Sequence, residues 1–207
     1  MLFSSLTFLF VFLPVVLIVY NILPMKAKNL WLLAASLSFY FYGEPRYLLL
    51  MLAVIFSSYI FGLLTEKAQG TKRKIILAVS VAVSLSALIF FKYTDFFISV
   101  SNGIFNTDFD LLKIALPIGI SFYTFQAISY NIDVYRGDTP AQKNPLSLAL
   151  YISLFPQLIA GPIVRYTDVA NMLKNRKHSI DGFYYGIRRF ATKKKKKIIL
   201  ANSFGTL

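Results

Sequence analysis

The sequence predicts an all-α, polytopic transmembrane helix bundle that contains a re-entrant or broken segment. Hydrophobic residues make up 57% of the 207 residues and the mean hydropathy is +0.61, whereas soluble domains are roughly 45–50% apolar. Several apolar runs of spanning length alternate with short charged loops. Prolines and a glycine interrupt the last apolar run, "SLFPQLIAGPIVRY" at 153–166, where a bilayer would otherwise require an unbroken helix.

Charge and rare residues exclude several functional classes. The chain has no cysteine and one histidine, so it offers neither a disulfide nor a cysteine- or histidine-rich metal site. The net charge is +13, but residues 165–197 hold eleven of the 22 basic and two of the nine acidic residues. A basic block between apolar runs is typical of cytoplasmic-side membrane loops, so we expect no nucleic-acid partner.

The first element is a transmembrane helix over residues 2–23. No charge precedes Lys26 and no A-x-A sequence is present, so the run does not have the pattern of a cleaved signal peptide. Its 22 residues reach about 33 Å as a helix, which is enough to cross a hydrocarbon core of about 30 Å.

Four further apolar runs follow. The run at 30–42 is short for a full span, those at 48–64 and 75–91 are at the lower limit, and the run at 114–130 has Pro117 and Gly119 near its start. The intervening residues 92–113 mix charges with a short apolar stretch, so we expect an interfacial helix or loop there.

Positive charges give an orientation. Placing the loops with Lys26 and Lys28 and with 67–74 in the cytoplasm puts the N-terminus outside and residues 131–145 inside. The basic segment 165–197 should also lie inside, so residues 146–164 cannot cross the bilayer once. We therefore expect 146–164 to enter and return on one side, which is tolerated only where the backbone is buried in protein or lines a wet cavity.

Polar residues at membrane depth are the candidate site residues. They are expensive in hydrocarbon and so tend to face the interior. In the broken segment, Gln157 either serves function or satisfies backbone groups freed by Pro156, and Arg165 either serves function or snorkels to headgroups. In the preceding run, the polar face at i, i+3 and i+7 favours either helix packing or a substrate path. The candidates are Tyr123, Gln126, Tyr130, Pro156, Gln157, Gly161, Pro162 and Arg165.

Two other features favour ordinary surface roles. His178 lies among lysines and arginines, where no orienting partner or tuned pocket for a catalytic base is evident. Five adjacent lysines cannot share one helical face, and they suit anionic headgroups of the inner leaflet; these are Lys193, Lys194, Lys195, Lys196 and Lys197. The sequence has no glycine-rich phosphate loop and no G-x-S-x-G motif.

Several motifs resemble the membrane-bound O-acyltransferase (MBOAT) family. They are "LPIGISFYTFQAISYNIDVYRG" (116–137), "LFPQLIAGPIVRYTD" (154–168) and "FKY" (91–93). The stretches "MLFSSLTFLFVFLPVV" (1–16) and "SLSFYFYGEPRYLLLM" (36–51) are also similar to its bacterial branch, which includes alginate O-acetyltransferase and the D-alanyl transferase of teichoic acids. The likeness runs in order along nearly the whole chain.

The resemblance implies a multi-pass enzyme of the bacterial inner membrane whose bundle surrounds a tunnel. An acetyl or similar acyl group arrives on a cytoplasmic thioester donor, either acetyl-CoA or an acyl carrier protein. It is transferred to a hydroxyl of an extracytoplasmic polysaccharide or wall polymer, and a partner acetyltransferase is a further expectation. No bound cofactor or metal is implied.

The family's catalytic histidine lies in later spans, and His178 does not match it. The resemblance therefore implies that the chain is the N-terminal half of the enzyme and is inactive alone. A transporter or flippase-like protein and a non-catalytic membrane scaffold subunit remain as alternatives.

Overall fold

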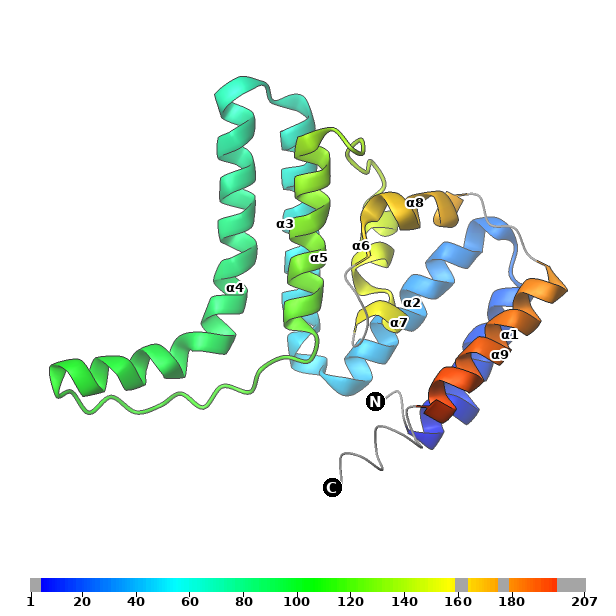
Figure 1. Cartoon of the computed structure of the whole chain (residues 1–207), viewed down its shortest axis with the longest axis horizontal. Coiled ribbons are helices and arrows are strands. Elements are labelled where there is room, and N and C mark those ends of the chain that lie inside the picture. Colours follow the sequence, from blue (N-terminus) through cyan, green and yellow to red (C-terminus); the bar gives the residue numbers. More distant parts are fainter. Residues whose placement is uncertain (1–4, 159–163, 175–178, 197–207) are drawn as a thin grey trace. The chain divides into compact units, whose positions relative to one another are not determined.

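A computed structural model describes residues 5–158, 164–174 and 179–196 of the chain (Figure 1). The described residues are helical or irregular and include no strand. The chain divides into two units, Met1–Ala170 and Asn171–Leu207. The first contains a π-helical turn at Phe8–Phe12 and helices α1 (Leu13–Ile22), α2 (Met25–Gly43), α3 (Leu48–Lys67), α4 (Gly70–Phe105), α5 (Ile120–Arg136), α6 (Pro145–Ser153) and α7 (Phe155–Leu158), with a 3-10 turn at Pro45–Tyr47. Helix α8 (Tyr166–Lys174) crosses the boundary, and α9 (Ile180–Lys196) belongs to the second unit.

Two helical groups make up the first unit. Helices α3, α4 and α5 pack against one another, and α6 packs against α2, α3 and α5. A buried serine–asparagine pair joins α4 to α5, because Asn131 Nδ2 donates to Ser80 Oγ at 2.7 Å. Glycine ends α5 in the usual way: Gly137 has φ +83° and its N–H donates to the carbonyls of Asp133 and Val134.

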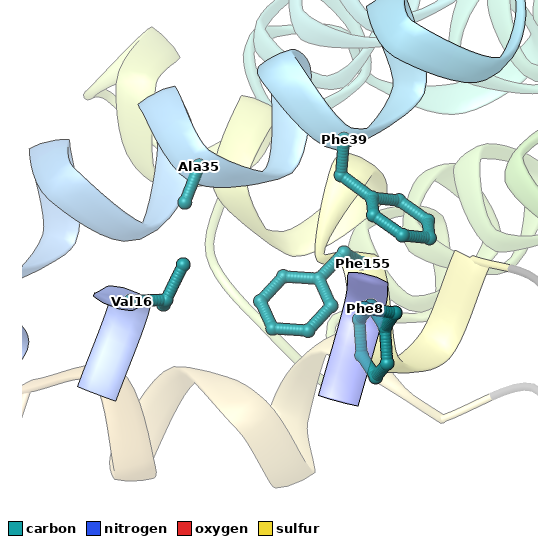
Figure 2. Packing of buried hydrophobic residues seen from close by; sticks show 5 residues of the cluster. All are labelled: Phe8, Val16, Ala35, Phe39 and Phe155. Atoms are coloured by element: carbon teal, nitrogen blue, oxygen red, sulfur yellow. The ribbon is translucent and has the colours of Figure 1, made fainter. Parts of the chain in front are cut away.

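A phenylalanine cluster joins the N-terminal helix to the broken segment. Phe8, Phe39 and Phe155 are buried, and their ring centroids lie 5.6–6.1 Å apart. Figure 2 shows the three rings turned toward one another, with Val16 and Ala35 beside them. Such aromatic contacts stabilise packing beyond their buried area, so residues 8 and 155 are fixed against α2 together.

Helix lengths differ from the expected runs. Helix α2 begins at Met25, five residues before the predicted run at 30–42. Helix α5 begins and ends six residues later than the predicted run at 114–130, because Gly119 at φ +77° forms its N-terminal cap. Residues 92–105, expected as an interfacial helix or loop, continue α4, which bends so that its two arms point in different directions (Figure 1).

The segment after α4 is held to that helix by side chains. Asp95 Oδ1 accepts from the N–H groups of Leu112 and Lys113 at 2.9 and 3.2 Å. Asn102 both donates to the Phe109 carbonyl and accepts from its N–H. The extended backbone therefore follows the second arm of α4 without belonging to a sheet.

Two helices of the described chain are long and apolar enough to cross a membrane. They are Pro45–Lys67 and Gly70–Phe105, and only 33% and 17% of their most apolar stretches are buried. Large apolar side chains such as Leu49 and Phe56 are mostly exposed. Because a core helix of a soluble protein would bury such groups, these faces indicate association with lipid. The number of crossings and the return path of 146–164 remain predictions.

Candidate functional site

The broken segment begins where α6 ends. Leu154 has φ −56° and ψ 111°, which lies outside the helical region, and α7 starts at Phe155. Pro156 has no N–H, so it cannot donate to the carbonyl four residues earlier, but it suits the first turn of a new helix. The predicted interruption therefore exists, and its first break precedes Pro156.

Side chains from two other helices satisfy the backbone groups that the break releases. In a continuous helix the Phe155 N–H would donate to the Tyr151 carbonyl. Instead, Phe155 N–H donates to Ser36 Oγ of α2 at 3.3 Å, and the Tyr151 carbonyl accepts from Gln126 Nε2 of α5 at 3.0 Å. Ser36 is fully buried and Gln126 is 4% exposed. Water does not reach these groups, so the two side chains supply the hydrogen-bond partners that the backbone would otherwise lack.

Two predicted candidates meet at this break. Gln126 Nε2 also lies 3.4 Å from Gln157 Oε1, which it reaches as a second, longer hydrogen bond. Gln126 and Ser36 thus satisfy the Tyr151 carbonyl and the Phe155 N–H that the break at Leu154 releases, whereas the Gln157 side chain accepts from Gln126. The amide pair joins α5 to α7, and Gln157 keeps part of its side chain accessible.

Glycine permits a close backbone approach on the other side of α7. A Cβ atom added to Gly119 would lie 2.9 Å from the Leu158 carbonyl oxygen, closer than real Cβ contacts. The left-handed φ of Gly119 is also one that other residues adopt at a cost. Gly119 therefore lets the start of α5 contact the end of α7.

Three tyrosines form a second buried cluster. Tyr166 packs edge-on against Tyr130 and Tyr151, with ring centroids 5.2 and 5.1 Å apart. Tyr151 Oη donates to the Val164 carbonyl at 2.7 Å. The cluster therefore fixes the chain that follows the interruption against α5 and α6.

The loop before α6 closes this cluster. Gln142 N–H donates to Tyr130 Oη at 2.8 Å, and the Gln142 side-chain amide donates to Tyr166 Oη. Tyr166 is buried, and this burial raises its pKa, an effect that the bond from Gln142 opposes. Tyr130 also packs so closely on Gly62 that an added Cβ would lie 2.8 Å from its hydroxyl.

A buried carboxyl lies at the C-terminal end of α5. Asp133 is 2% exposed, and its Oδ2 has no hydrogen-bond partner in the described parts of the chain. Burial raises the pKa of Asp133, and the positive charge of Arg165 opposes that effect most strongly. Arg165 is itself exposed, so the predicted candidate acts on a buried group of α5 from the surface.

The remaining candidates are placed as follows. Tyr123 and Tyr130 are fully buried on α5, and Tyr123 packs edge-on against Tyr40 at 6.4 Å. Pro156 is exposed. Gly161, Pro162, His178 and Lys197 lie outside the described residues, whereas Lys193–Lys196 form the last turn of α9. Across the described ranges, no three His, Cys, Asp or Glu side chains are grouped so that they could hold a metal ion.

Sequence reasoning missed Ser36 and Tyr151. Proline within an apolar run signals that freed backbone groups need partners, but the choice of partner depends on which helices pack together. Ser36 lies 119 residues from Phe155, so no local pattern pairs them.

Comparison with known proteins identifies relatives along the whole chain. A probable alginate O-acetylase AlgI of Pseudomonas aeruginosa is 42% identical over all of this chain, which covers 41% of that protein. The corresponding protein of Azotobacter vinelandii is 41% identical, with 43% of its length covered. A peptidoglycan O-acetyltransferase of Helicobacter pylori is 33% identical over 98% of the chain, with 45% of its length covered.

The chain thus spans about two fifths of the length of the curated relatives it matches. No family model matches the sequence, and no solved structure matches it. These O-acetyltransferase relatives confirm the resemblance that the sequence motifs predicted.

Proposed function

We propose, from the homology of this chain to alginate and peptidoglycan O-acetyltransferases along its whole length, that it is part of a membrane-bound O-acyltransferase. The enzyme would lie as a multi-pass protein in the bacterial inner membrane. It would transfer an acetyl or similar acyl group from a cytoplasmic thioester, acetyl-CoA or an acyl carrier protein, to a hydroxyl of an extracytoplasmic polysaccharide or wall polymer.

The observation that carries the proposal is the breadth of the similarity. Relatives named for two different acceptors, alginate and peptidoglycan, each match at least 98% of this chain. What they share is O-acetylation of a polymer, so the reaction class is better supported than either acceptor.

The reaction requires little chemistry from the described residues. The acceptor oxygen attacks the thioester carbonyl, its proton passes to a general base, and the thiolate of the donor leaves. We expect that base to be a histidine beyond residue 207, so this chain alone would be inactive. The described helices would instead form part of the tunnel wall.

Buried polar groups on α5 support the tunnel. Thr124, Asn131 and Asp133 are at most 2% exposed, and each has a side-chain oxygen with no hydrogen-bond partner in the part of the chain that the structure describes. Buried polar atoms are normally paired. Thr124 and Asn131 are two turns apart on one face of α5, so a polar path along that face, reached by substrate or by water, would supply their missing partners.

Other contacts are part of the same proposal. The run Lys193–Lys197 would face anionic headgroups of the cytoplasmic leaflet. An acyl carrier protein or a second acetyltransferase would deliver or receive the acyl group on either side of the bundle. No bound cofactor is required.

A transporter or flippase-like protein is the second candidate, because broken helices with buried polar groups also form transport sites. A scaffold subunit without catalysis is the third. Transfer of a labelled acetyl group to the polymer would distinguish the enzyme from both of these candidates.

The test uses membranes containing the full-length protein, radiolabelled acetyl-CoA and either alginate or peptidoglycan. Alkali-labile label in one polymer, absent from membranes without the protein, is the expected result. Polymer that moves across the membrane without acquiring label would favour the transporter and overturn the proposal, and neither transport nor label would favour the scaffold.

A further inference from the structure

A basic cavity lies between the N-terminal end of α4 and the C-terminal end of α5, away from the broken segment. Its volume is about 540 Å³, and it is lined by Gly70, Thr71, Arg73, Lys74, Tyr135 and Arg136. Figure 1 shows these two helix ends at the same end of the packed α4–α5 pair. Three of the six lining residues are cations and none is acidic.

One of these cations is fixed in place. Arg73 Nη2 donates to the Val134 carbonyl at 2.9 Å, and its guanidinium lies 5.5 Å from the ring centroid of Tyr135. These contacts hold a positive charge at the cavity wall without neutralising it. Lys74 and Arg136 are exposed, so they can turn toward a ligand in the same cavity.

Three cations around one cavity repel one another, and an anion between them relieves that repulsion. Arginine forks match phosphate oxygens in geometry, and lysine adds a compact charge. The first backbone N–H groups of the 36-residue α4 lie at the same wall of the cavity. They are hydrogen-bond donors and carry the partial positive charge of a helix N-terminus. The chemistry of the lining therefore fits a phosphate group.

The helix below the cavity indicates what carries that phosphate. Thr71 lines the cavity, and residues four apart from it on the same face of α4 are apolar and 42–56% exposed: Ile75, Val79 and Val83. A soluble phosphate would gain nothing from such a stripe. A phospholipid would place its phosphate in the cavity and its acyl chains along the stripe.

We propose that this cavity binds the phosphate of an anionic phospholipid. The site is separate from the proposed acyl transfer and holds whether or not that function is correct. It places α4 and α5 against one lipid molecule at the side of the membrane where the positive-inside rule puts the basic residues of 67–74.

The test is native mass spectrometry of the full-length protein released from detergent micelles, titrated with phosphatidylglycerol, phosphatidylcholine or inorganic phosphate. The wild type should retain phosphatidylglycerol in preference to phosphatidylcholine. The double variant K74Q/R136Q should lose roughly tenfold in apparent affinity, because each basic residue beside an anionic lipid contributes to binding. The control is K72Q, which removes one positive charge from the same helical turn as Lys74 but does not line the cavity; it should change affinity by less than about twofold.

Three results would overturn the proposal: unchanged phosphatidylglycerol affinity in K74Q/R136Q, an equal loss in K72Q, or competition by inorganic phosphate without any preference for the lipid. The last would assign the cavity to a soluble phosphate. A photoactivatable phosphatidylglycerol added to the wild type gives a second reading that needs no variant. Labelled peptides should contain residues 70–75 or 135–136, and labelling confined to other segments would contradict the site.

Discussion

Gln126 Nε2 donates to the carbonyl oxygen of Tyr151 across 3.0 Å, and this bond replaces one that the main chain gives up at Leu154. A helix that stops inside an apolar environment leaves a carbonyl and an N–H without partners, at a cost of several kcal/mol each. Here α5 satisfies the carbonyl and α2 satisfies the N–H. Side chains of α2 and α5 therefore hydrogen-bond to the backbone at the interruption, and its stability depends on these two helices.

Replacing Gln126 by Leu should destabilise the protein by about 1–2 kcal/mol, because the Tyr151 carbonyl would remain buried without a donor. The free energy of unfolding in detergent micelles measures the change. Gln69→Leu is the control, since Gln69 is exposed and makes no capping hydrogen bond at the start of α4. Equal losses in the two variants would show that the Gln126–Tyr151 bond has no special weight.

Ser36→Ala should cost about 1 kcal/mol through loss of the acceptor for the Phe155 N–H. Ser57→Ala is matched to it, because Ser57 Oγ donates to the Val54 carbonyl of its own helix, and this variant should be nearly neutral. Hydrogen exchange at the Phe155 amide provides a local measurement. Faster exchange in S36A but not in S57A is expected, and unchanged exchange in S36A would contradict the contact.

Gly119→Ala should destabilise more than Gly137→Ala. Both glycines have φ near +80°, but a Cβ at Gly137 meets nothing within 4 Å, whereas at Gly119 it meets the Leu158 carbonyl. Left-handed backbone costs alanine about 1–2 kcal/mol, and the contact adds about 1–3 kcal/mol at Gly119 alone. Gly103→Ala lies within α4 with open space around it and should stabilise by about 0.5–1 kcal/mol. The thermal unfolding midpoint should be highest for G103A, lower for G137A and lowest for G119A. Any other order would refute the close approach at Gly119.

Asp133 should make the stability of the protein fall as pH rises. Burial raises its folded pKa above the ordinary value of 3.8, so the folded state holds the proton more tightly than the unfolded state. The stabilisation is present below the unfolded pKa and is lost as pH rises through the folded pKa. Asp133→Asn should remove this slope from unfolding curves measured from about pH 4 upward. Asp110→Asn, at an exposed position, should leave the slope in place; an identical slope in wild type and D133N would disprove the assignment.

The sequence predicts the helical class and the interruption at 153–166 because both depend on local chemistry: apolar runs of spanning length, and prolines that remove a donor. It does not place helix ends well. Lys92 and Asp95 favoured a separate interfacial helix or loop over 92–113, whereas residues 92–105 continue α4 and the Asp95 carboxylate holds the chain that returns beside it. Charge within an apolar helix is not a reliable sign that the helix ends.

The candidate site shows the same limit. Periodicity placed Gln126 among the candidates, and Pro156 indicated that backbone groups would need partners. Neither could show that Gln126 itself supplies one of them, because that pairing depends on how α5 packs beside α6 and α7. Neither signal could identify Ser36, because one serine in the apolar run at 30–42 gives no sign of a distant partner.

The contact between Ser36 and Phe155 has a consequence for biogenesis. Ser36 is synthesised 119 residues before its partner, which at about 5–20 residues per second is a delay on the order of 10 s. During that interval the contact between Phe8 and Phe39 lacks the Phe155 ring that completes the cluster. A ribosome stalled before codon 155 would leave an unsealed helix pair, which is the form that a membrane quality-control protease or an insertion chaperone would encounter.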